Sequence, residues 1–549
     1  MSDTGGFLPD HNEIILNRYR KVEALRAAGH NPYVNKAEDL PAAAHHPFAN
    51  ESERKHSSAE IMHKADELIR LAEQNDPAGT VRVAGRVLSI RRMGKAAFFH
   101  LQDGAGKIQV YVKKDTVDSH GFDLYKESLM DTGDIAGVDG TVFKTKTGEV
   151  TVLARTLRLL TKSTRPLPEK WHGLKDQELR YRRRYVDLIV NETTREVFQR
   201  RARIVASIRR FLDGRGYIEV ETPMMQRMYG GAAARPFITH HNALDMDLYL
   251  RIAPELYLKR LVVGGLERVY EINRNFRNEG ISVRHNPEFT MLEAYTAYYD
   301  YNDSMGLVED LIAMACREAA GALRLPFGEH VIDFTPPFRR RRLIDCVRED
   351  LGLDVDWGRP QEQGRAEALR YVQSRKDLTE EDRARILFEM SAAGASNDRV
   401  IVALFETFLE ATLIQPTFVI DYPKSLCPLA KSSAQRPEVA ERFELYAAGL
   451  ELSNAYSELN DPREQFERFR EQVAQREAGD AETESMDEDY VMALEYGMPP
   501  TSGIGIGIDR LAMLLTNSPS IRDVILFPLM RERKDAPAET EAEAEAGAP

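Results

Sequence analysis

The stretch GIGIGIDR, residues 503–510, alternates glycine and isoleucine three times before an Asp-Arg pair opens the apolar run LAMLL. Successive side chains of a β-strand point to opposite faces, so the glycines would share one face and the isoleucines the other. The isoleucine face predicts core packing, and the glycine face is flat enough for another flat group to approach closely. Strict alternation would place Arg510 on the core face. We therefore expect the strand to end near Ile508 and a helix to carry Arg510 in its first turn.

Two interpretations of this stretch are compatible with its sequence. In the first, the glycines form the floor of a ligand site, and Arg510 meets a phosphate or stacks on a base. In the second, a glycine strand packs under a helix and binds nothing. The spacing is not G-x-G-x-x-G, so the dinucleotide-binding fingerprint does not apply.

The composition is that of a globular chain with several domains. The chain has 549 residues, 43% of them hydrophobic and 29% charged, and no apolar run long enough to cross a membrane. Its N-terminus lacks the basic and apolar regions of a secretory signal. Three widely spaced cysteines form no C-x-x-C pair, which argues against a zinc site and for a reducing cytoplasm.

The charge distribution leaves a nucleic-acid partner open. A formal net charge of −13 opposes phosphate binding, but the tail from Asp535 supplies five of the negative charges. Arginines also cluster at 180–184 and at 339–342. Local basic patches could therefore still hold RNA.

The N-terminal part of the chain divides into two expected segments. Residues 1–78 read as a helical extension, with amphipathic helices over 12–29 and 58–74. Residues 79–162 carry about five short β-rich runs with glycine-containing turns, a pattern typical of an OB-fold β-barrel. A structural barrel without a ligand is the alternative interpretation.

The rest of the chain divides into three expected segments. Residues 163–180 read as a linker, since they contain prolines and few apolar positions. Residues 181–531 alternate long helices with partly polar strands, which predicts an α+β domain with an antiparallel sheet flanked by helices. Residues 532–549 form an acidic tail whose composition predicts disorder.

Two further stretches concentrate residues suited to chemistry. In residues 268–301, Arg277 and Arg284 suit a phosphate-bearing ligand and Phe289 could stack on a base, although a solvated charged hairpin is the alternative. In the third stretch, Glu451 and Glu458 are carboxylates of the kind that hold Mg²⁺ beside phosphates. Taken alone, that stretch would read as an exposed acidic surface.

Together with GYIEVETPMM at 216–225, these stretches resemble the three signature motifs of the class II aminoacyl-tRNA synthetases. GYIEVETPMM is similar to motif 1, FRNEGISVRHNPEF at 276–289 to motif 2, and GIGIGIDR to motif 3. Within the class, residues 230–265 and 281–301 look like the lysyl-tRNA synthetase family almost throughout. The resemblance covers about residues 80–530. It implies a class II catalytic domain after an OB-fold anticodon-binding domain, and ATP-dependent attachment of L-lysine to tRNA(Lys).

The resemblance implies roles at the ATP site. Arg277 would bridge the α-phosphate and the lysine carboxylate, and Arg277 and Arg510 would stabilise the charge of the reaction. Phe289 and Arg510 would enclose the adenine, while Glu451 and Glu458 would hold Mg²⁺. The implied ATP-binding residues are Arg277, Glu279, Arg284, His285, Asn286, Phe289, Glu451, Gly505, Gly507 and Arg510.

The implied lysine pocket is anionic with an aromatic wall, as a cationic side chain requires. Its residues are Gly231, Glu255, Arg277, Glu293, Tyr295, Asn454, Tyr456 and Glu458. A relative that charges aspartate would need cations where Glu293 and Glu458 stand, because buried carboxylates reject an anionic side chain. Charging of aspartate or asparagine is therefore the disfavoured alternative.

The resemblance also implies partners outside the catalytic site. Phe98, Gln102 and Glu149 match positions that read anticodon bases by stacking and hydrogen bonding. Phe99 could substitute for Phe98, because only one of the two can face outward. A homodimer through motif 1, a cytoplasmic location and no membrane partner complete these expectations.

Some features depart from the family pattern. Residues 40–75 look longer than the usual link, QRMYGG at 226–231 replaces a more apolar loop, and the acidic tail is no family feature. Two other functions are disfavoured. Enzymes that attach lysine to a protein lack the barrel, and a non-catalytic RNA-binding module would not need the matched ATP and Mg²⁺ residues.

Overall fold

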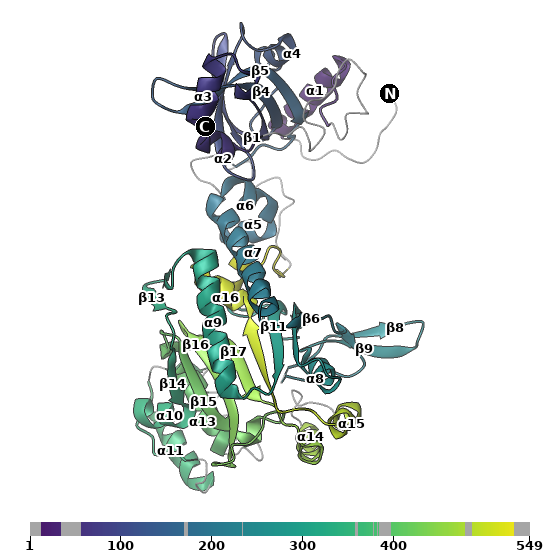
Figure 1. Cartoon of the computed structure of the whole chain (residues 1–549), viewed down its shortest axis with the longest axis vertical. Helices are drawn as coiled ribbons and strands as arrows, with labels where there is room; N and C mark the ends of the chain where they lie inside the picture. Colours follow the sequence, from purple (N-terminus) through teal and green to yellow (C-terminus); the bar gives the residue numbers. More distant parts are fainter. Residues whose placement is uncertain are drawn as a thin grey trace. The chain divides into compact units, whose positions relative to one another are not determined.

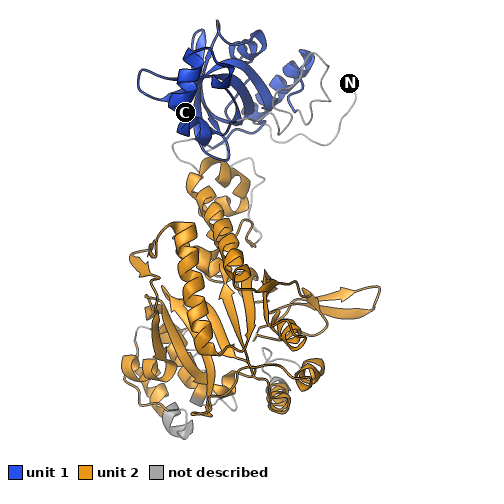
Figure 2. Cartoon of the chain, viewed as in Figure 1, with its two compact units in different colours: residues 1–173, 532–549 blue, residues 174–531 orange. Residues whose placement is uncertain are grey.

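The computed structural model describes the protein in two compact units (Figures 1 and 2). Unit 1 comprises residues 1–173 with 532–549, and unit 2 comprises residues 174–531. The predicted acidic tail, and residues 40–55 of the long link, lie outside the described part. The described residues are 12–33, 56–168, 174–232, 234–356, 361–376, 378–380, 383, 397–477 and 486–531.

Unit 1 contains a closed five-stranded barrel, which confirms the predicted OB-fold architecture. The strand order is β1-β2-β3-β5-β4. Phe99 and Val110 are fully buried in its interior, while alternate residues such as Phe98 stay partly exposed, because period two separates the faces. The elements are β1 (Thr80–Met93), β2 (Ala96–Gln102), β3 (Lys107–Lys113), α4 (Ser119–Lys126), β4 (Ile135–Lys144) and β5 (Val150–Thr161).

Within the described residues, three α-helices precede the barrel. In α1 (Glu13–Ala27), the Asn12 side chain accepts a hydrogen bond from the backbone N–H of Ile14 and caps the helix. The single helix predicted over 58–74 is wrong, since α2 (Ser58–His63) and α3 (Ala65–Glu73) meet at Lys64. Its apolar periodicity continues through the break, so the pattern alone could not locate it.

Unit 2 is built on an eight-stranded sheet, which confirms the predicted α+β architecture. Its order is β14-β15-β16-β17-β18-β11-β10-β6. The pairs are antiparallel except β14–β15 and β10–β6 at the two edges. The strands are β6 (Ile218–Glu219), β10 (Arg268–Phe276), β11 (Glu288–Ala297), β14 (Arg339–Arg342), β15 (Thr417–Pro423), β16 (Val439–Ala447), β17 (Leu450–Ser457) and β18 (Thr501–Gly507).

Helices cover both faces of this sheet. The isoleucines of β18 belong to a core shared with α7 (Glu192–Asp213), α9 (Tyr301–Ala320) and α16 (Ile508–Leu515), and Figure 1 shows α7 and α9 crossing that face together. Two smaller cores lie on the opposite face, one under α10 (Leu343–Leu351) and α13 (Asn397–Phe408) and one under α8 (Glu255–Val263). Tyr456 of β17 packs against both of these cores. The part of the sheet that carries the predicted site residues therefore lies between them.

The remaining elements surround this framework. The arginine cluster at 180–184 is partly structural, because Arg184 is buried and pairs with Asp187 at 2.7 Å. Across the described ranges, no helix combines the length and apolar character needed to cross a bilayer. The other elements of unit 2 are α5 (Gln177–Arg182), α6 (Arg184–Val190), β7 (Met225–Gln226), β8 (Ile238–His241), β9 (Met246–Leu250), β12 (Arg324–Phe327), β13 (His330–Asp333), α11 (Gln361–Ser374), α14 (Pro462–Glu477), α15 (Glu488–Glu495) and α17 (Ile521–Val524).

Candidate active site

The register of three antiparallel strands assembles several of the predicted residues on one sheet face. Directly paired residues of an antiparallel ladder share a face. One row runs Asn454–Gly505–Glu293 across β17, β18 and β11, and the next row runs Tyr456–Gly503–Tyr295. Side chains separated by about 160 residues in the sequence therefore lie on one surface.

The glycine face of β18 is more crowded than the sequence predicted. A Cβ added at Gly503 would overlap Glu458 and Tyr295, and one at Gly505 would lie 2.5 Å from the terminal methyl of Met291. At Gly507 the nearest atoms belong to Arg510, at an ordinary 3.8 Å. The expectation of a continuous open floor is therefore wrong. Neighbouring side chains lie across the first two glycines, and Gly507 alone of the three is partly exposed.

The predicted strand-to-helix transition is confirmed. β18 ends at Gly507 and α16 begins at Ile508, so Arg510 lies in the first helical turn. Nη1 of Arg510 donates to the backbone oxygen of Glu451 at 2.9 Å and to its Oε2 at 3.1 Å. Nη2 of Arg510 lies 3.4 Å from Nε2 of His285.

Arg277 has a buried hydrogen-bond donor that no described residue uses. Its guanidinium lies 5.0 Å from the ring centroid of Phe289, and its buried Nε has no hydrogen-bond partner within the described chain. Burial lowers the pKa of Arg277 from its usual value, against the charges of Glu279 and Glu451. A buried donor without a partner is costly, so this position suits an anionic ligand.

The other residues predicted near ATP surround these two arginines. Arg284 lies 3.3 Å from Oε1 of Glu410, a carboxylate that the sequence did not flag. Nδ2 of Asn286 donates to the backbone oxygen of Glu288 at 2.5 Å, while its buried Oδ1 accepts no hydrogen bond from any described residue. His285 and Glu279 are exposed. Together these residues present positive charges and polar atoms that lack a hydrogen-bond partner in the described chain, as a nucleotide site requires.

The predicted lysine-binding residues form a buried acidic pocket. Glu293 is 5% exposed and accepts a hydrogen bond from the Tyr295 hydroxyl at 3.2 Å. Burial and the charge of Glu255 raise the pKa of Glu293 to about 8. Tyr456 donates from its hydroxyl to Glu255. Glu293 is ion-paired to no cation in the described residues, so its negative charge is left for a ligand to neutralise.

The loop and strand residues of the pocket are held by neighbours. Gly231 has φ +85°, and a Cβ there would lie 2.9 Å from Cβ of Glu255, so glycine allows the loop to approach α8. Oδ1 of Asn454 accepts from Nε of Arg442 at 3.1 Å, which leaves the Asn454 amide NH₂ available as a donor.

Lys259 is a pocket residue that the sequence analysis missed. It is fully buried on α8, and Nζ lies 2.5 Å from Oε1 of Glu255 and 2.5 Å from Oε2 of Glu458. The i, i+4 spacing of Glu255 and Lys259 was a weak signal, because such pairs usually lie on solvent-exposed helix faces.

The two predicted Mg²⁺ ligands have different surroundings. Glu451 is partly exposed beside Arg510, whereas Glu458 is buried and committed through Oε2 to Lys259. Oε1 of Glu458 is buried and unbonded within the described chain, and an unbonded carboxylate oxygen suits a cation. No group of three or more metal-binding side chains occurs in the described ranges. Glu451 lies at the start of β17 and Glu458 just past its end, about 20 Å away along an extended strand, so one ion cannot contact both carboxylates.

One barrel surface in unit 1 gathers aromatic and polar side chains. Phe98 and Tyr111 stack with ring centroids 4.5 Å apart, while Phe99 is buried, so Phe98 is the outward residue as expected. Nε2 of Gln109 donates to Oε2 of Glu149 at 2.7 Å. Gln102, predicted to read an anticodon base, is 7% exposed at the end of β2, and the glutamine that contacts Glu149 is Gln109.

Comparisons with known proteins identify the family to which the chain is similar. The family described as tRNA synthetases class II (D, K and N) matches residues 176–531, and the OB-fold nucleic acid binding domain matches residues 81–160. A lysine–tRNA ligase of Pelotomaculum thermopropionicum is 52% identical over 532 residues, covering 97% of each chain. One from Syntrophomonas wolfei is 55% identical over 83% of this chain and 88% of that relative. One from Bacillus subtilis is 50% identical over 95% of this chain and 99% of that relative.

Proposed function

We propose, from the premise that this chain belongs to the class II tRNA synthetases (D, K and N), that it is an ATP-dependent lysine–tRNA ligase. It activates L-lysine to lysyl-adenylate with release of pyrophosphate, and then transfers lysine to the 3′ end of tRNA(Lys). The observation that carries the choice of lysine is Glu293, a buried carboxylate without an ion-pair partner among the described residues. A buried carboxylate of this kind is costly unless a cation reaches it, and the ε-ammonium of lysine is such a cation.

The first step needs positioning rather than a covalent nucleophile. A carboxylate oxygen of lysine attacks the α-phosphorus, and the bond to the pyrophosphate oxygen breaks. Arg277 binds the α-phosphate and the lysine carboxylate, because its buried Nε is free to donate. Arg510 lies near Glu451 and His285, from where it can cover the adenine opposite Phe289. These fixed cations stabilise the charge that develops at phosphorus.

The remaining ATP contacts follow from the same cluster. Asn286 offers an unbonded Oδ1 to the adenine amino group, while Arg284 and His285 meet the outer phosphates. Glu279 and Gly507 border the nucleotide, and Gly505 does so once Met291 moves. Glu451, beside Arg510, would hold Mg²⁺, which would neutralise phosphate charge. Glu458, the other predicted ligand, is paired with Lys259 in the lysine pocket.

The second step adds the tRNA partner. The terminal 3′-hydroxyl attacks the carbonyl carbon of lysyl-adenylate, and AMP leaves. In unit 1, Phe98 and Tyr111 offer a stacking surface for splayed bases, and Glu149 and Gln109 offer hydrogen-bonding groups for their edges. We assign this surface to the anticodon of tRNA(Lys).

Two expectations about assembly belong to the same proposal. Motif 1 would form a homodimer interface, since β6 is an edge strand and Ile218, Met224 and Met225 expose apolar side chains there. The cytoplasm is the proposed location, because Cys316, Cys346 and Cys427 are all unpaired thiols, as a reducing compartment favours.

ATP–pyrophosphate exchange tests the proposed function directly. Exchange by the purified protein should depend on L-lysine and should not respond to L-aspartate or L-asparagine. Stimulation by aspartate alone would replace the proposal with a sister enzyme. Exchange with lysine but no transfer to tRNA(Lys) would favour a ligase that modifies a protein, and no adenylate formation would favour a non-catalytic RNA-binding protein.

A further inference from the structure

Lys259 places a second ammonium group inside the pocket proposed for lysine. The side chain is fully buried, and its Nζ lies 2.5 Å from a carboxylate oxygen of both Glu255 and Glu458. It also lies 5.4 Å from the Tyr456 ring centroid and 5.8 Å from that of Tyr490. Carboxylates and aromatic faces are the surroundings that an ammonium prefers.

These contacts fix the two carboxylates that face the pocket. Oε1 of Glu255 accepts hydrogen bonds from both Nζ of Lys259 and the Tyr456 hydroxyl. Glu458 is held through Oε2, while its buried Oε1 points across Gly503 and has no bonding partner in the described chain. Lys259 therefore restrains one oxygen of each carboxylate and leaves Oε1 of Glu458 for a ligand.

The charges of the pocket match the net charge of lysine only when Lys259 is counted. Glu255, Glu293 and Glu458 are its three carboxylates when all are ionised, and Lys259 and Arg277 are its two cations. Glu271 adds no net charge, because it pairs with Arg251 at 2.7 Å. In the lysine-bound state, in which Glu293 has lost the proton of the empty pocket, one uncompensated negative charge remains, equal and opposite to the net charge of L-lysine. Without Lys259 there would be two.

We propose that Lys259 is a positioning and specificity-determining residue: an internal ammonium that fixes Glu255 and Glu458 and sets the pocket to accept one net positive charge. This inference rests on the proposed function. It differs from a purely structural role, in which Lys259 would only pack α8 onto the sheet and its loss would affect all substrates equally.

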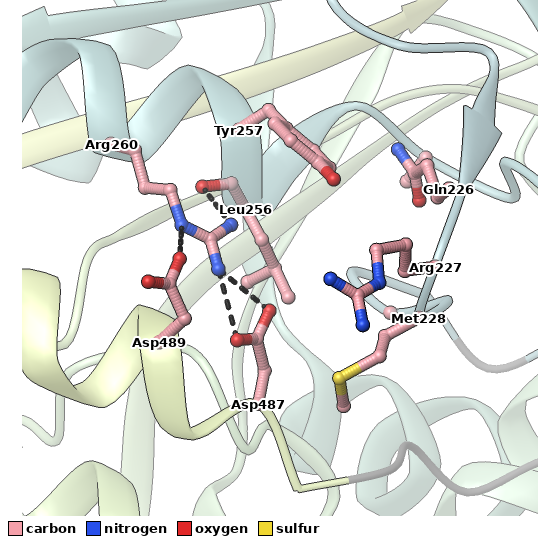
Figure 3. A pocket seen from close by; sticks show the side chains of 10 residues that line it. Gln226, Arg227, Met228, Leu256, Tyr257, Arg260, Asp487 and Asp489 are labelled. Atoms are coloured by element: carbon pink, nitrogen blue, oxygen red, sulfur yellow. Dashed lines mark hydrogen bonds and ion pairs between the residues drawn. The ribbon is translucent and has the colours of Figure 1, made fainter. Parts of the chain in front are cut away.

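The test compares Lys259→Met, which keeps the apolar stem, with Arg260→Met as the matched control. Arg260 is the next residue on α8, but it pairs with Asp487 and Asp489 and, unlike Lys259, lines a cavity of about 370 Å³ (Figure 3). The measurements are KM for lysine, KM for ATP, and the preference for L-lysine over L-norleucine, a neutral analogue, in pyrophosphate exchange.

Lys259→Met should raise KM for lysine at least tenfold and change KM for ATP less than threefold, and the preference over norleucine should fall at least tenfold. Arg260→Met should leave all three quantities within threefold of the wild type. A lysine KM within twofold of the wild type, or equal losses for lysine and ATP, would overturn the inference.

A second variant decides the question if Lys259→Met does not fold. Lys259→Arg keeps the charge but replaces a compact ammonium with a planar fork. It should retain the preference for lysine over norleucine while raising KM for lysine. Unchanged KM, or loss of the preference with the charge present, would contradict the role. Lysine-independent exchange by the wild-type protein would instead refute the proposed function itself.

Discussion

The two halves of the active-site face hold their charges in opposite ways. In the phosphate half, Arg510 and Arg284 are partly exposed and rest on Glu451 and Glu410 at 3.1 and 3.3 Å. In the lysine half, the charges are buried, and Lys259 holds its two carboxylates at 2.5 Å. Exposed pairs are weak and easily exchanged, whereas buried pairs are costly to break. The lysine half is therefore preorganised for its ligand. In the phosphate half, the arginines must give up contacts with carboxylates when phosphates bind.

The largest expected effect is that of replacing Arg277, because its buried Nε in the phosphate half has no hydrogen-bond partner among the described residues. Arg277→Ala should lower kcat/KM in pyrophosphate exchange by on the order of 10³-fold, because its hydrogen bonds to the developing charge are lost. Arg274→Met is the matched control, since Arg274 lies three residues earlier, in β10, and faces Glu288 at 3.5 Å. A loss below tenfold for Arg277→Ala would assign phosphate stabilisation to another residue.

The second-largest expected effect changes lysine binding without changing ATP binding. Glu293→Gln removes the buried charge while keeping the shape, and KM for lysine should rise by about 100-fold, as expected for a desolvated charge pair. KM for ATP should change little, because the phosphate half is untouched. Glu288→Gln, at the exposed start of the same strand, is the control. An unchanged lysine KM would refute the role of Glu293.

The pH dependence of lysine binding probes the same carboxyl. Burial raises the pKa of Glu293 to about 8, so the empty pocket carries a proton at pH 7 that the lysine ammonium must displace. Lysine affinity should therefore rise about tenfold per pH unit up to pH 8 and then level off. Calorimetry in buffers of different ionisation enthalpy should detect proton release below pH 8. Glu293→Gln should abolish the slope, and a persistent slope would assign the proton elsewhere.

The smallest expected effect compares two glycines of β18. Gly503→Ala should raise KM for lysine about tenfold, because the new methyl would overlap Glu458 and Tyr295 and overpacking costs ~1–3 kcal/mol. Gly507→Ala has an ordinary 3.8 Å approach to Arg510 and should change either KM less than about threefold. Equal effects of the two substitutions would contradict the unequal crowding along the strand.

Much of the framework could be predicted from the sequence, because it follows from local periodicity. The alternation in GIGIGIDR predicted the strand, its end and the helical position of Arg510. The same rule separated Phe98 from Phe99 in the barrel. These predictions succeed since side-chain direction in a strand depends on neighbours in the sequence alone.

The parts that could not be predicted depend on contacts between distant segments. Lys259 reads as an ordinary helical lysine until Glu458, about 200 residues later, is placed against it. Met291 and Tyr295 cover two glycines because β11 pairs with β18, which no local pattern reveals. Gln109 replaces Gln102 beside Glu149 because β3 and β5 pair in parallel.

The two edges of the large sheet have a consequence for how the protein behaves at high concentration. An edge strand exposes unpaired backbone groups that can template growth by other chains. At one edge, β14 consists of four arginines, with Arg341 ion-paired to Glu349 and Asp350 and Arg342 to Asp421. A strand arriving there would have to displace or bury guanidinium groups. The arginines thus disfavour the pairing of another chain along β14. The short strand β6 is the edge of this sheet at which we expect another chain to pair.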